Sequence, residues 1–306
     1  MILHIDHINE MTKKDPAAFM LATDEAYQNQ LVAIASHIRA THRQRPIVLI
    51  SGPSGSGKTT TAQMLERILD TWGLESHTLS MDNYFKSLSP EEQRMADRGE
   101  LDLESPERVD ATLLHEQLLA MVRGEPVSLP RYDFVNACRV DSGRILERKE
   151  NEIVILEGIH ALNPDVVRLP DENMTKLYIS VRTRVVYDDI TLHPSKVRLL
   201  RRMLRDRVGR GRRPEETIAL YSSVQRGESH FIMPYKHRAD FDIDTFIAYE
   251  LGVYKKAFYE ELKDIHDEPE IDALLTILEH TDEIDAVGVP RGSLIREFIG
   301  GGEFEH

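Results

Sequence analysis

Short apolar runs alternate along the chain with longer stretches of helical spacing. The runs that suit buried strands lie at 46–51, 77–81, 153–157 and 176–181. A polar–apolar alternation at 240–244 predicts a fifth, half-exposed strand. Between the runs, residues 59–69 and 109–122 carry apolar side chains at the spacing of one helix face. This alternation predicts an α/β fold whose parallel sheet is covered by helices on both faces.

The two ends of the chain have a different, helical pattern. Residues 15–40 predict an amphipathic helix, with Asp15 as its cap and Pro16 at its first position. After residue 250 the sequence becomes acidic and helical. The predicted organisation is a helical N-terminal extension over 1–45, one α/β domain over 46–248 and an acidic helical C-terminal extension over 249–306.

Residues 124–152 interrupt the alternation of strands and helices. Two segments with a strand-like pattern, at 127–132 and 144–148, flank a turn-forming sequence at 141–143. We therefore expect an inserted β-hairpin with its turn at 141–143.

Composition and charge limit the partners of this 306-residue chain. Its 38 Lys and Arg against 52 Asp and Glu give a net charge of −14, which opposes binding to nucleic acid and to anionic membranes. No apolar run approaches the ~18 residues of a membrane span, and the N-terminus lacks the pattern of a signal peptide. A single cysteine, Cys138, excludes an internal disulfide framework and a multi-thiolate zinc site. We expect a cytoplasmic protein that binds neither nucleic acid nor membranes.

One motif dominates the candidate chemistry. Residues 52–59 match the pattern G-x-x-x-x-G-K-[ST] and lie between a predicted strand and a predicted helix. The glycines let backbone N–H groups point at phosphate oxygens, and the start of the helix adds the positive end of its dipole. Lys58 supplies charge for the β- and γ-phosphates, and the hydroxyl of Thr59 suits Mg²⁺. The residues expected to bind ATP are Gly52, Pro53, Ser54, Gly55, Ser56, Gly57, Lys58, Thr59 and Thr60.

Two acidic residues follow or close predicted strands. Asp82 comes just after the strand at 77–81, at the edge of a parallel sheet that faces the ligand crevice. There it could accept a proton from an attacking hydroxyl or hold Mg²⁺ through water, although a turn or cap aspartate is the alternative. Glu157 closes an apolar strand, where a buried charge needs a partner. It is a candidate for a magnesium-linked acid, and an exposed strand end is the alternative.

A dense basic segment lies between Lys196 and Arg213, where nine Lys and Arg residues are opposed only by Asp206. It could be a solvated helix face, an RNA-binding helix or a lid that closes over phosphates. The net charge of −14 opposes the RNA reading. We expect Gly209 and Gly211 to break the helix among arginines, which favours a mobile lid over about 200–213.

Several motifs together resemble a known family. They are the phosphate loop, Ser80-Met81-Asp82-Asn83-Tyr84-Phe85, Tyr132-Asp133-Phe134, Ile155-Leu156-Glu157-Gly158-Ile159 and Arg201-Arg202-Met203-Leu204-Arg205-Asp206 followed by Arg210-Gly211-Arg212. Over about 46–246 the chain resembles the uridine kinase and phosphoribulokinase family of P-loop kinases, and most closely its bacterial uridine kinase-like branch.

The resemblance implies a reaction and a set of site residues. The reaction is transfer of the γ-phosphoryl group of Mg²⁺-ATP to the 5′-hydroxyl of a nucleoside, with uridine or cytidine as the leading acceptor. Asp82 matches the family's general base, and Lys58 and Arg205 are the other catalytic candidates. The implied magnesium-linked residues are Thr59, Glu157 and Asp82. The implied acceptor or lid residues are Asp82, Glu104, Tyr132, Arg202, Arg210 and Arg212.

Three positions depart from the family's pattern for recognising the base. Ala137 and Leu220 stand where uridine kinases have a histidine and a glutamine, and Phe85 stands where they have a tyrosine. Each change removes a hydrogen-bonding group, whereas the phosphoryl-transfer parts are intact. The alternatives are therefore a P-loop kinase of another nucleoside or sugar-like acceptor, or a nucleotide-gated regulatory module with little kinase activity. The sequence leaves open whether the chain forms a homo-oligomer.

Overall fold

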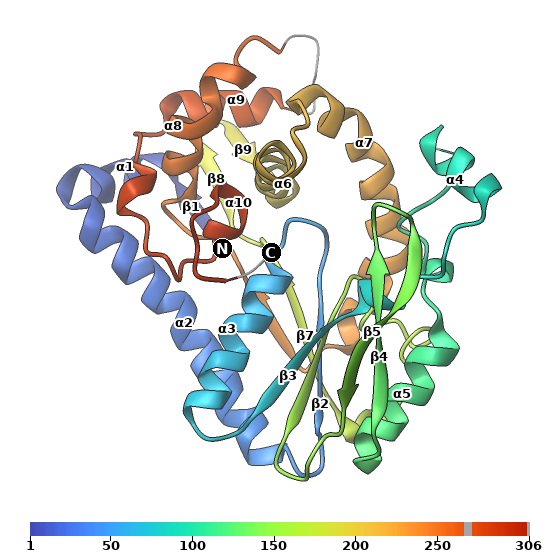
Figure 1. Ribbon diagram of the computed structural model, residues 1–306. Coiled ribbons are helices and arrows are strands. Elements are labelled where there is room, and N and C mark those ends of the chain that lie inside the picture. The colour runs from blue at the N-terminus through green and yellow to red at the C-terminus, as the bar shows by residue number, and fades with distance from the viewer. Residues whose placement is uncertain (99, 266–270, 305–306) are drawn as a thin grey trace.

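The computed structural model describes residues 1–98, 100–265 and 271–304, without the side chains of Asp97 and Arg210. Its central strands are β2 (Ile47–Ser51), β3 (Ser76–Ser80), β6 (Ile153–Glu157), β7 (Met174–Ser180) and β10 (Phe241–Asp244). They form one parallel sheet in the order β10–β7–β2–β6–β3 (Figure 1). All five predicted strands are present, with bounds within two residues of the prediction.

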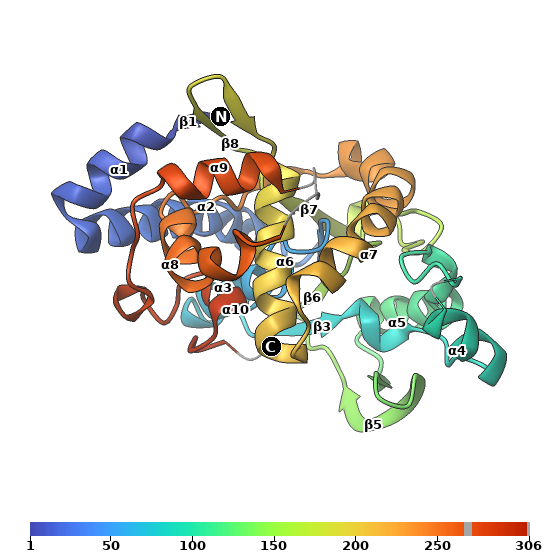
Figure 2. The ribbon, with the colours of Figure 1, turned by 90° about the horizontal axis from the view of Figure 1, so that it is seen from above.

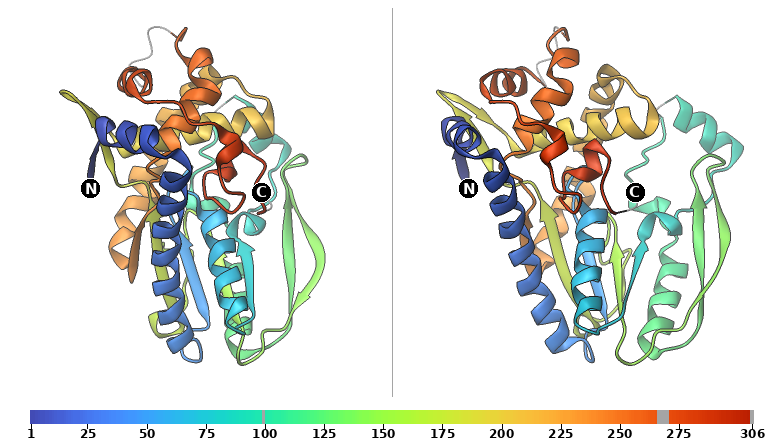
Figure 3. Two further views of the ribbon diagram at one scale, coloured as in Figure 1. Left: turned by 90° about the vertical axis from the view of Figure 1, so that its left-hand side faces the viewer. Right: turned by 60° about the vertical axis from the view of Figure 1, so that its left-hand side comes forward.

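Helices cover both faces of this sheet, because successive side chains of each buried strand point to opposite faces. In β2, Val48 and Ile50 pack against α2 (Pro16–Thr41) and α3 (Lys58–Thr71). Ile47 and Leu49 point the other way, into a second apolar cluster with α5 (Ala111–Arg123) and the inserted hairpin. Figure 3 shows α2 and α3 side by side on one face. The predicted α/β fold is confirmed.

The N-terminal residues form a predicted helix and an unpredicted small sheet. Asp15 caps α2 by accepting the backbone N–H of Ala18 at 3.0 Å, with Pro16 in the first turn, as predicted. The remaining elements of this region are β1 (Ile2–His4), α1 (Ile5–Lys14), β8 (Arg184–Tyr187) and β9 (Ile190–Leu192). β1 pairs parallel with β8, which pairs antiparallel with β9. These strands are too short for alternation to reveal them.

The inserted hairpin is present, but its turn is not where the sequence predicts it. Its strands are β4 (Val127–Asp133) and β5 (Cys138–Leu146), so the connection is at 134–137 and Ala137 has a positive φ of 49°. Leu129 pairs with Arg144 whereas Pro130 pairs with Asp141, so residues 142–143 form a bulge within β5. The predicted turn at 141–143 is wrong, because turn-forming residues also suit a bulge in which glycine adopts positive φ.

Further helices lie above the carboxyl ends of the strands (Figures 1 and 2). They are α6 (Pro194–Arg210), α7 (Pro214–Gly227), α8 (Glu250–Leu262), α9 (Asp272–His280) and α10 (Arg296–Ile299). Beside the hairpin lies α4 (Pro90–Asp97). The short helical segments are η1 (Met81–Tyr84), η2 (Pro106–Arg108), η3 (Asp171–Asn173), η4 (Glu228–Ile232), η5 (Met233–Arg238) and η6 (Ala286–Gly288). Among the described residues, no helix has both the length and the apolar character that crossing a bilayer requires.

Candidate active site

The phosphate loop joins β2 to α3 at the carboxyl edge of the sheet. Gly55 and Gly57 have positive φ angles of 74° and 86°, which favour glycine. A Cβ on Gly52 would lie 2.1 Å from the carbonyl oxygen of Ile179, and one on Gly55 would lie 2.8 Å from that of Arg198. The glycines therefore allow β7 and α6 to approach the loop closely.

Two predicted acids meet beside this loop. Glu157 ends β6 opposite Ser80 of β3, and Asp82 lies in η1, which follows β3 directly. Burial raises the pKa of Asp82, while the charges of Lys58 and Arg205 act in the opposite direction. Burial and the charge of Asp82 raise the pKa of Glu157 to about 7. These carboxylates therefore form a poorly solvated acidic pair whose negative charge a bound cation would compensate.

The basic segment contains two arginines that hold the scaffold together. Arg198 forms a buried, two-pronged ion pair with Glu228 and donates to the backbone oxygen of Ser54 at 3.0 Å. Arg201 is fully buried and pairs with Glu250, at 2.7 Å from Nε to Oε2. Both guanidinium groups are therefore engaged in fixing α6 to the fold, so the interpretation of the whole segment as a lid is too broad.

Two other arginines of α6 face the phosphate loop. Arg202 Nη1 and Arg205 Nη2 lie 3.4 and 3.5 Å from Ser54 Oγ. Arg205 also acts on the pKa of Asp82, which places its charge near the acidic pair. Guanidinium groups in this place suit phosphate oxygens.

The end of the predicted lid is organised differently from the prediction. Helix α6 continues through Gly209 to Arg210, and Gly211 ends it with a φ of 62°. The prediction that Gly209 breaks the helix is therefore wrong. Arg212 lies 3.7 Å from the buried carboxylate of Asp206. The side chain of Arg210, a predicted lid residue, lies outside the described part of the chain.

Arg205→Ala is expected to lower kcat by about tenfold to a hundredfold with little change in the Kd for ATP, because guanidinium contacts strengthen as charge shifts in the transition state. Arg202 still contacts Ser54 in this variant, which limits the loss of kcat. Steady-state kinetics and direct nucleotide binding measure the two quantities. The matched control is Arg207→Ala on the same helix, whose side chain pairs with Glu261 and not with the loop. Equal effects of the two variants would contradict a role at the phosphates.

Glu104 lies near the catalytic groups. A Cβ on Gly227 would lie 2.6 Å from the Cβ of Glu104, so the end of α7 approaches Glu104 closely. Burial raises the pKa of Glu104, while the charges of Arg202 and Lys58 oppose that rise. The structure therefore brings this predicted acceptor residue, far from the loop in sequence, into the electrostatic field of the phosphate site.

Tyr132 is connected to the segment that carries Asp82. Its backbone N–H donates to Asn83 Oδ1 at 3.1 Å, and its ring packs edge-to-face against Phe85 and Phe134 at 5.6 and 5.0 Å between centroids. Asn83 was not among the predicted site residues, although its place next to Asp82 was an available signal. The result is an aromatic cluster at the turn end of the hairpin.

The positions that depart from the family's pattern offer no polar side chain here either. Ala137 is in the hairpin turn, where its carbonyl accepts the N–H of Leu88 at 2.9 Å. Leu220 is 42% exposed on α7, whereas its neighbour Tyr221 is buried and donates to the Ser195 carbonyl.

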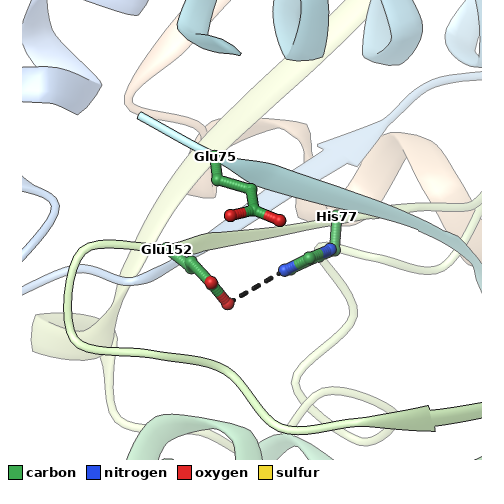
Figure 4. A group of neighbouring side chains, drawn as sticks. All are labelled: Glu75, His77 and Glu152. Atoms are coloured by element: carbon green, nitrogen blue, oxygen red, sulfur yellow. Dashed lines mark hydrogen bonds and ion pairs between the residues drawn. The ribbon is translucent and has the colours of Figure 1, made fainter. Parts of the chain in front are cut away.

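A second cluster of polar side chains lies at the opposite, amino-terminal edge of the sheet. Glu75, His77 and Glu152 place their ligand atoms within 4.8 Å of one another (Figure 4). Glu152 contacts His77 Nε2 and Lys149 Nζ, each at 3.0 Å. A metal ion would have to displace these contacts, so the cluster is better explained as an ion-paired link between the starts of β3 and β6.

Glu152→Gln is expected to lower the melting temperature at pH 7. Burial alone would raise the pKa of Glu152, but hydrogen bonds from Lys149 and His77 hold it at about 2. Because the pKa of Glu152 is lower in the folded chain than in the unfolded chain, its carboxylate stabilises the fold at pH values above about 4.5, and this contribution is lost as pH falls from about 4.5 toward 2. Calorimetry should show the wild type and the variant converging in that range. Glu150→Gln, at an exposed neighbouring position, is the control, and a pH-independent difference would contradict the assignment.

The fold and the site define a class of protein. A phosphate loop at the edge of a parallel sheet, with a candidate base just after β3, the next strand along the chain, is typical of a P-loop phosphotransferase. The chain belongs to the phosphoribulokinase / uridine kinase family, whose model matches residues 47–249. It is therefore a kinase that transfers a phosphoryl group to a hydroxyl acceptor.

Individual relatives carry related names. The chain is 35% identical to a uridine kinase of Lactobacillus johnsonii over 201 residues, 64% of this chain and 85% of the relative. It is 32% identical to a uridine kinase of Borrelia duttonii over 214 residues, 70% of this chain and 90% of the relative. A D-glycerate 3-kinase from Cryptococcus neoformans aligns in structure with a TM-score of 0.44 and 16% identity, over 73% of this chain and 89% of that one.

Proposed function

We propose that the chain phosphorylates the 5′-hydroxyl of uridine or cytidine with ATP as donor. The observation that carries this proposal is the placement of Asp82 beside the phosphate loop, within the fields of Lys58 and Arg205. The uridine kinase names of the relatives support the nucleoside as acceptor.

The proposed reaction is a direct displacement. The acceptor hydroxyl oxygen forms a bond to the γ-phosphorus, the bond from that phosphorus to the β,γ-bridging oxygen breaks, and ADP leaves with the electron pair. Asp82 accepts the hydroxyl proton, and its raised pKa makes it a better base at neutral pH. Lys58 and Arg205 offset the negative charge on the phosphoryl oxygens.

We propose that Thr59, Glu157 and Asp82 hold Mg²⁺. Their hydroxyl and carboxylate oxygens are the ligands that Mg²⁺ prefers. Burial and the charge of Asp82 raise the pKa of Glu157, and a cation bound between the two carboxylates would oppose that rise. When bound, the ion would neutralise charge on the β- and γ-phosphate oxygens.

Acceptor recognition is expected to rest on the sugar more than on the base. Glu104 can accept hydrogen bonds from a ribose diol, and Tyr132 with its neighbouring rings can contact a flat ring. Ala137, Leu220 and Phe85 provide no polar side-chain group to read the base. These apolar positions also support the second candidate, a kinase of another ribosyl or sugar-like compound. Arg212 and Arg210 stay proposed lid residues.

An acceptor panel tests this proposal. ADP release is measured with uridine, cytidine, adenosine, ribose, uracil or no acceptor. We expect release with the pyrimidine nucleosides at high KM, and none above background with uracil, which lacks the hydroxyl. Turnover of ribose alone would favour the sugar-like candidate. No acceptor-dependent release at all, with ATP bound, would favour the nucleotide-gated module.

A further inference from the structure

We propose that residues 293–304 form a wall of the nucleotide site, on the side of the α-phosphate and nucleoside of ATP. Leu294 and Glu297 are its positioning residues. The inference rests on the proposed binding of ATP by the phosphate loop. The family model matches residues 47–249, so this segment lies outside the matched part of the chain.

Leu294 packs directly against the phosphate loop. It is fully buried, and its Cδ1 lies 2.9 Å from the place where Gly57 would carry a Cβ. On the other side, the Thr61 hydroxyl donates to the Gly57 carbonyl at 2.6 Å and lies 2.7 Å from the Tyr27 hydroxyl of α2. The left-handed turn at Gly57 is thus supported by α3 itself and by segments from both ends of the chain.

Glu297 contacts the next part of the loop. Its Oε2 accepts a hydrogen bond from the fully buried hydroxyl of Thr60 at 2.7 Å. The charge of Glu297 also contributes to the raised pKa of Glu157, so its carboxylate lies within the field of the phosphate site. A residue outside the matched range 47–249 therefore orients the Thr60 hydroxyl.

Phe298 reaches the first half of the loop through an arginine. Its ring lies 5.0 Å from the guanidinium carbon of Arg201. That guanidinium donates to the Gly55 carbonyl at 3.2 Å and to the Thr245 carbonyl at 2.6 Å. Figure 2 shows α10 next to both α3 and α6, so the segment lies against both helices that flank the loop.

A buried polar triad anchors the start of the segment. Ser293 Oγ donates to Asp24 Oδ1 at 2.9 Å and lies 2.7 Å from the Tyr249 hydroxyl, which donates to Asp24 Oδ2 at 2.9 Å. These bonds join α2, the start of α8 and the C-terminal segment. They fix the point at which the wall begins.

The direction of ATP along the loop follows from the chemistry. Transfer requires the γ-phosphate to face Asp82, and Lys58 meets the β- and γ-phosphates. The α-phosphate and nucleoside must then leave over the first turn of α3, where the wall contacts Gly57 and Thr60. A loop held in its binding conformation before ATP arrives pays less of the ordering cost at binding. The wall should consequently strengthen nucleotide binding without changing acceptor affinity.

The test compares two leucines that are buried alike. Leu294→Ala and Leu278→Ala each remove a fully buried side chain from the same apolar cluster, but Leu278 lies in α9, away from the loop. Both should lower the melting temperature. Only Leu294→Ala should weaken MgATP binding, measured by calorimetry, by about tenfold, with the KM for the acceptor unchanged. Leu294→Met, which keeps the volume, should restore binding.

Glu297 gives a second measurement if Leu294→Ala does not fold. Glu297→Ala and Glu297→Gln both remove the carboxylate charge, but only Glu297→Gln keeps an acceptor oxygen for the Thr60 hydroxyl, so Glu297→Ala should bind MgATP about fivefold more weakly than Glu297→Gln. A wild type that binds no MgATP would refute the proposed function itself. A wild type that binds, with Leu294→Ala binding as tightly as wild type or Glu297→Ala binding as tightly as Glu297→Gln, would overturn the wall alone.

Discussion

Replacing Lys58 with alanine is expected to lower kcat by at least about 10³-fold, the largest effect of any single substitution in this chain. The lysine is the charge of the phosphate loop that meets the β- and γ-phosphates, and its charge acts on both Asp82 and Glu157. Arg202 and Arg205 approach from α6 and contact Ser54, so neither replaces an ammonium held by the loop.

The measurement is steady-state ADP release, with circular dichroism to verify folding. Lys256→Ala is the control, because this lysine pairs with Asp285 on the C-terminal extension. A folded Lys58→Ala variant that keeps near wild-type turnover would show that phosphoryl transfer does not use this loop.

Asp82→Asn is expected to lower kcat by at least about 10²-fold while the Kd for ATP changes little. The amide keeps the shape of the side chain but cannot accept the acceptor's proton. Because burial raises the pKa of Asp82, wild-type activity should fall with acidification at a pH above the ordinary range of an aspartate. The residual activity of Asp82→Asn should not show this fall on acidification.

The pH–rate profiles of both proteins measure this directly, with Asp285→Asn as a control at an exposed aspartate. If the substitution changes only the KM for the acceptor, Asp82 is a binding residue and the base lies elsewhere.

The sheet and the loop could be predicted because their signals are local. Ile47 to Ile50 is apolar on both faces, as a strand buried on both sides requires, and the glycine pattern that follows has few other uses. The hairpin turn could not be located, because Gly143 suits a bulge as well as a turn and only the pairing with Leu129 and Pro130 distinguishes them.

The arginines show why part of the site could not be predicted. Arg201 and Arg202 are adjacent in sequence, but neighbouring positions on a helix differ by about 100° in direction. One therefore pairs with buried Glu250, and the other lies over Ser54. No spacing within α6 reveals a partner that lies 49 positions away.

The C-terminal wall was missed for a related reason. Helix α10 has four residues, too few for a periodic pattern, and Glu297 meets Thr60 across 237 positions of sequence. Contacts of this kind become visible only when the chain is folded.

The central claim is that this chain moves the γ-phosphoryl group of ATP onto a small hydroxyl compound. The most direct measurement supplies ATP labelled with ³²P at the γ-position, Mg²⁺ and uridine, and separates the products. The account predicts label in a nucleoside monophosphate, with ADP formed in equal amount and both lost in Lys58→Ala. Label found only in inorganic phosphate, with uridine and every other acceptor of the panel, would contradict it.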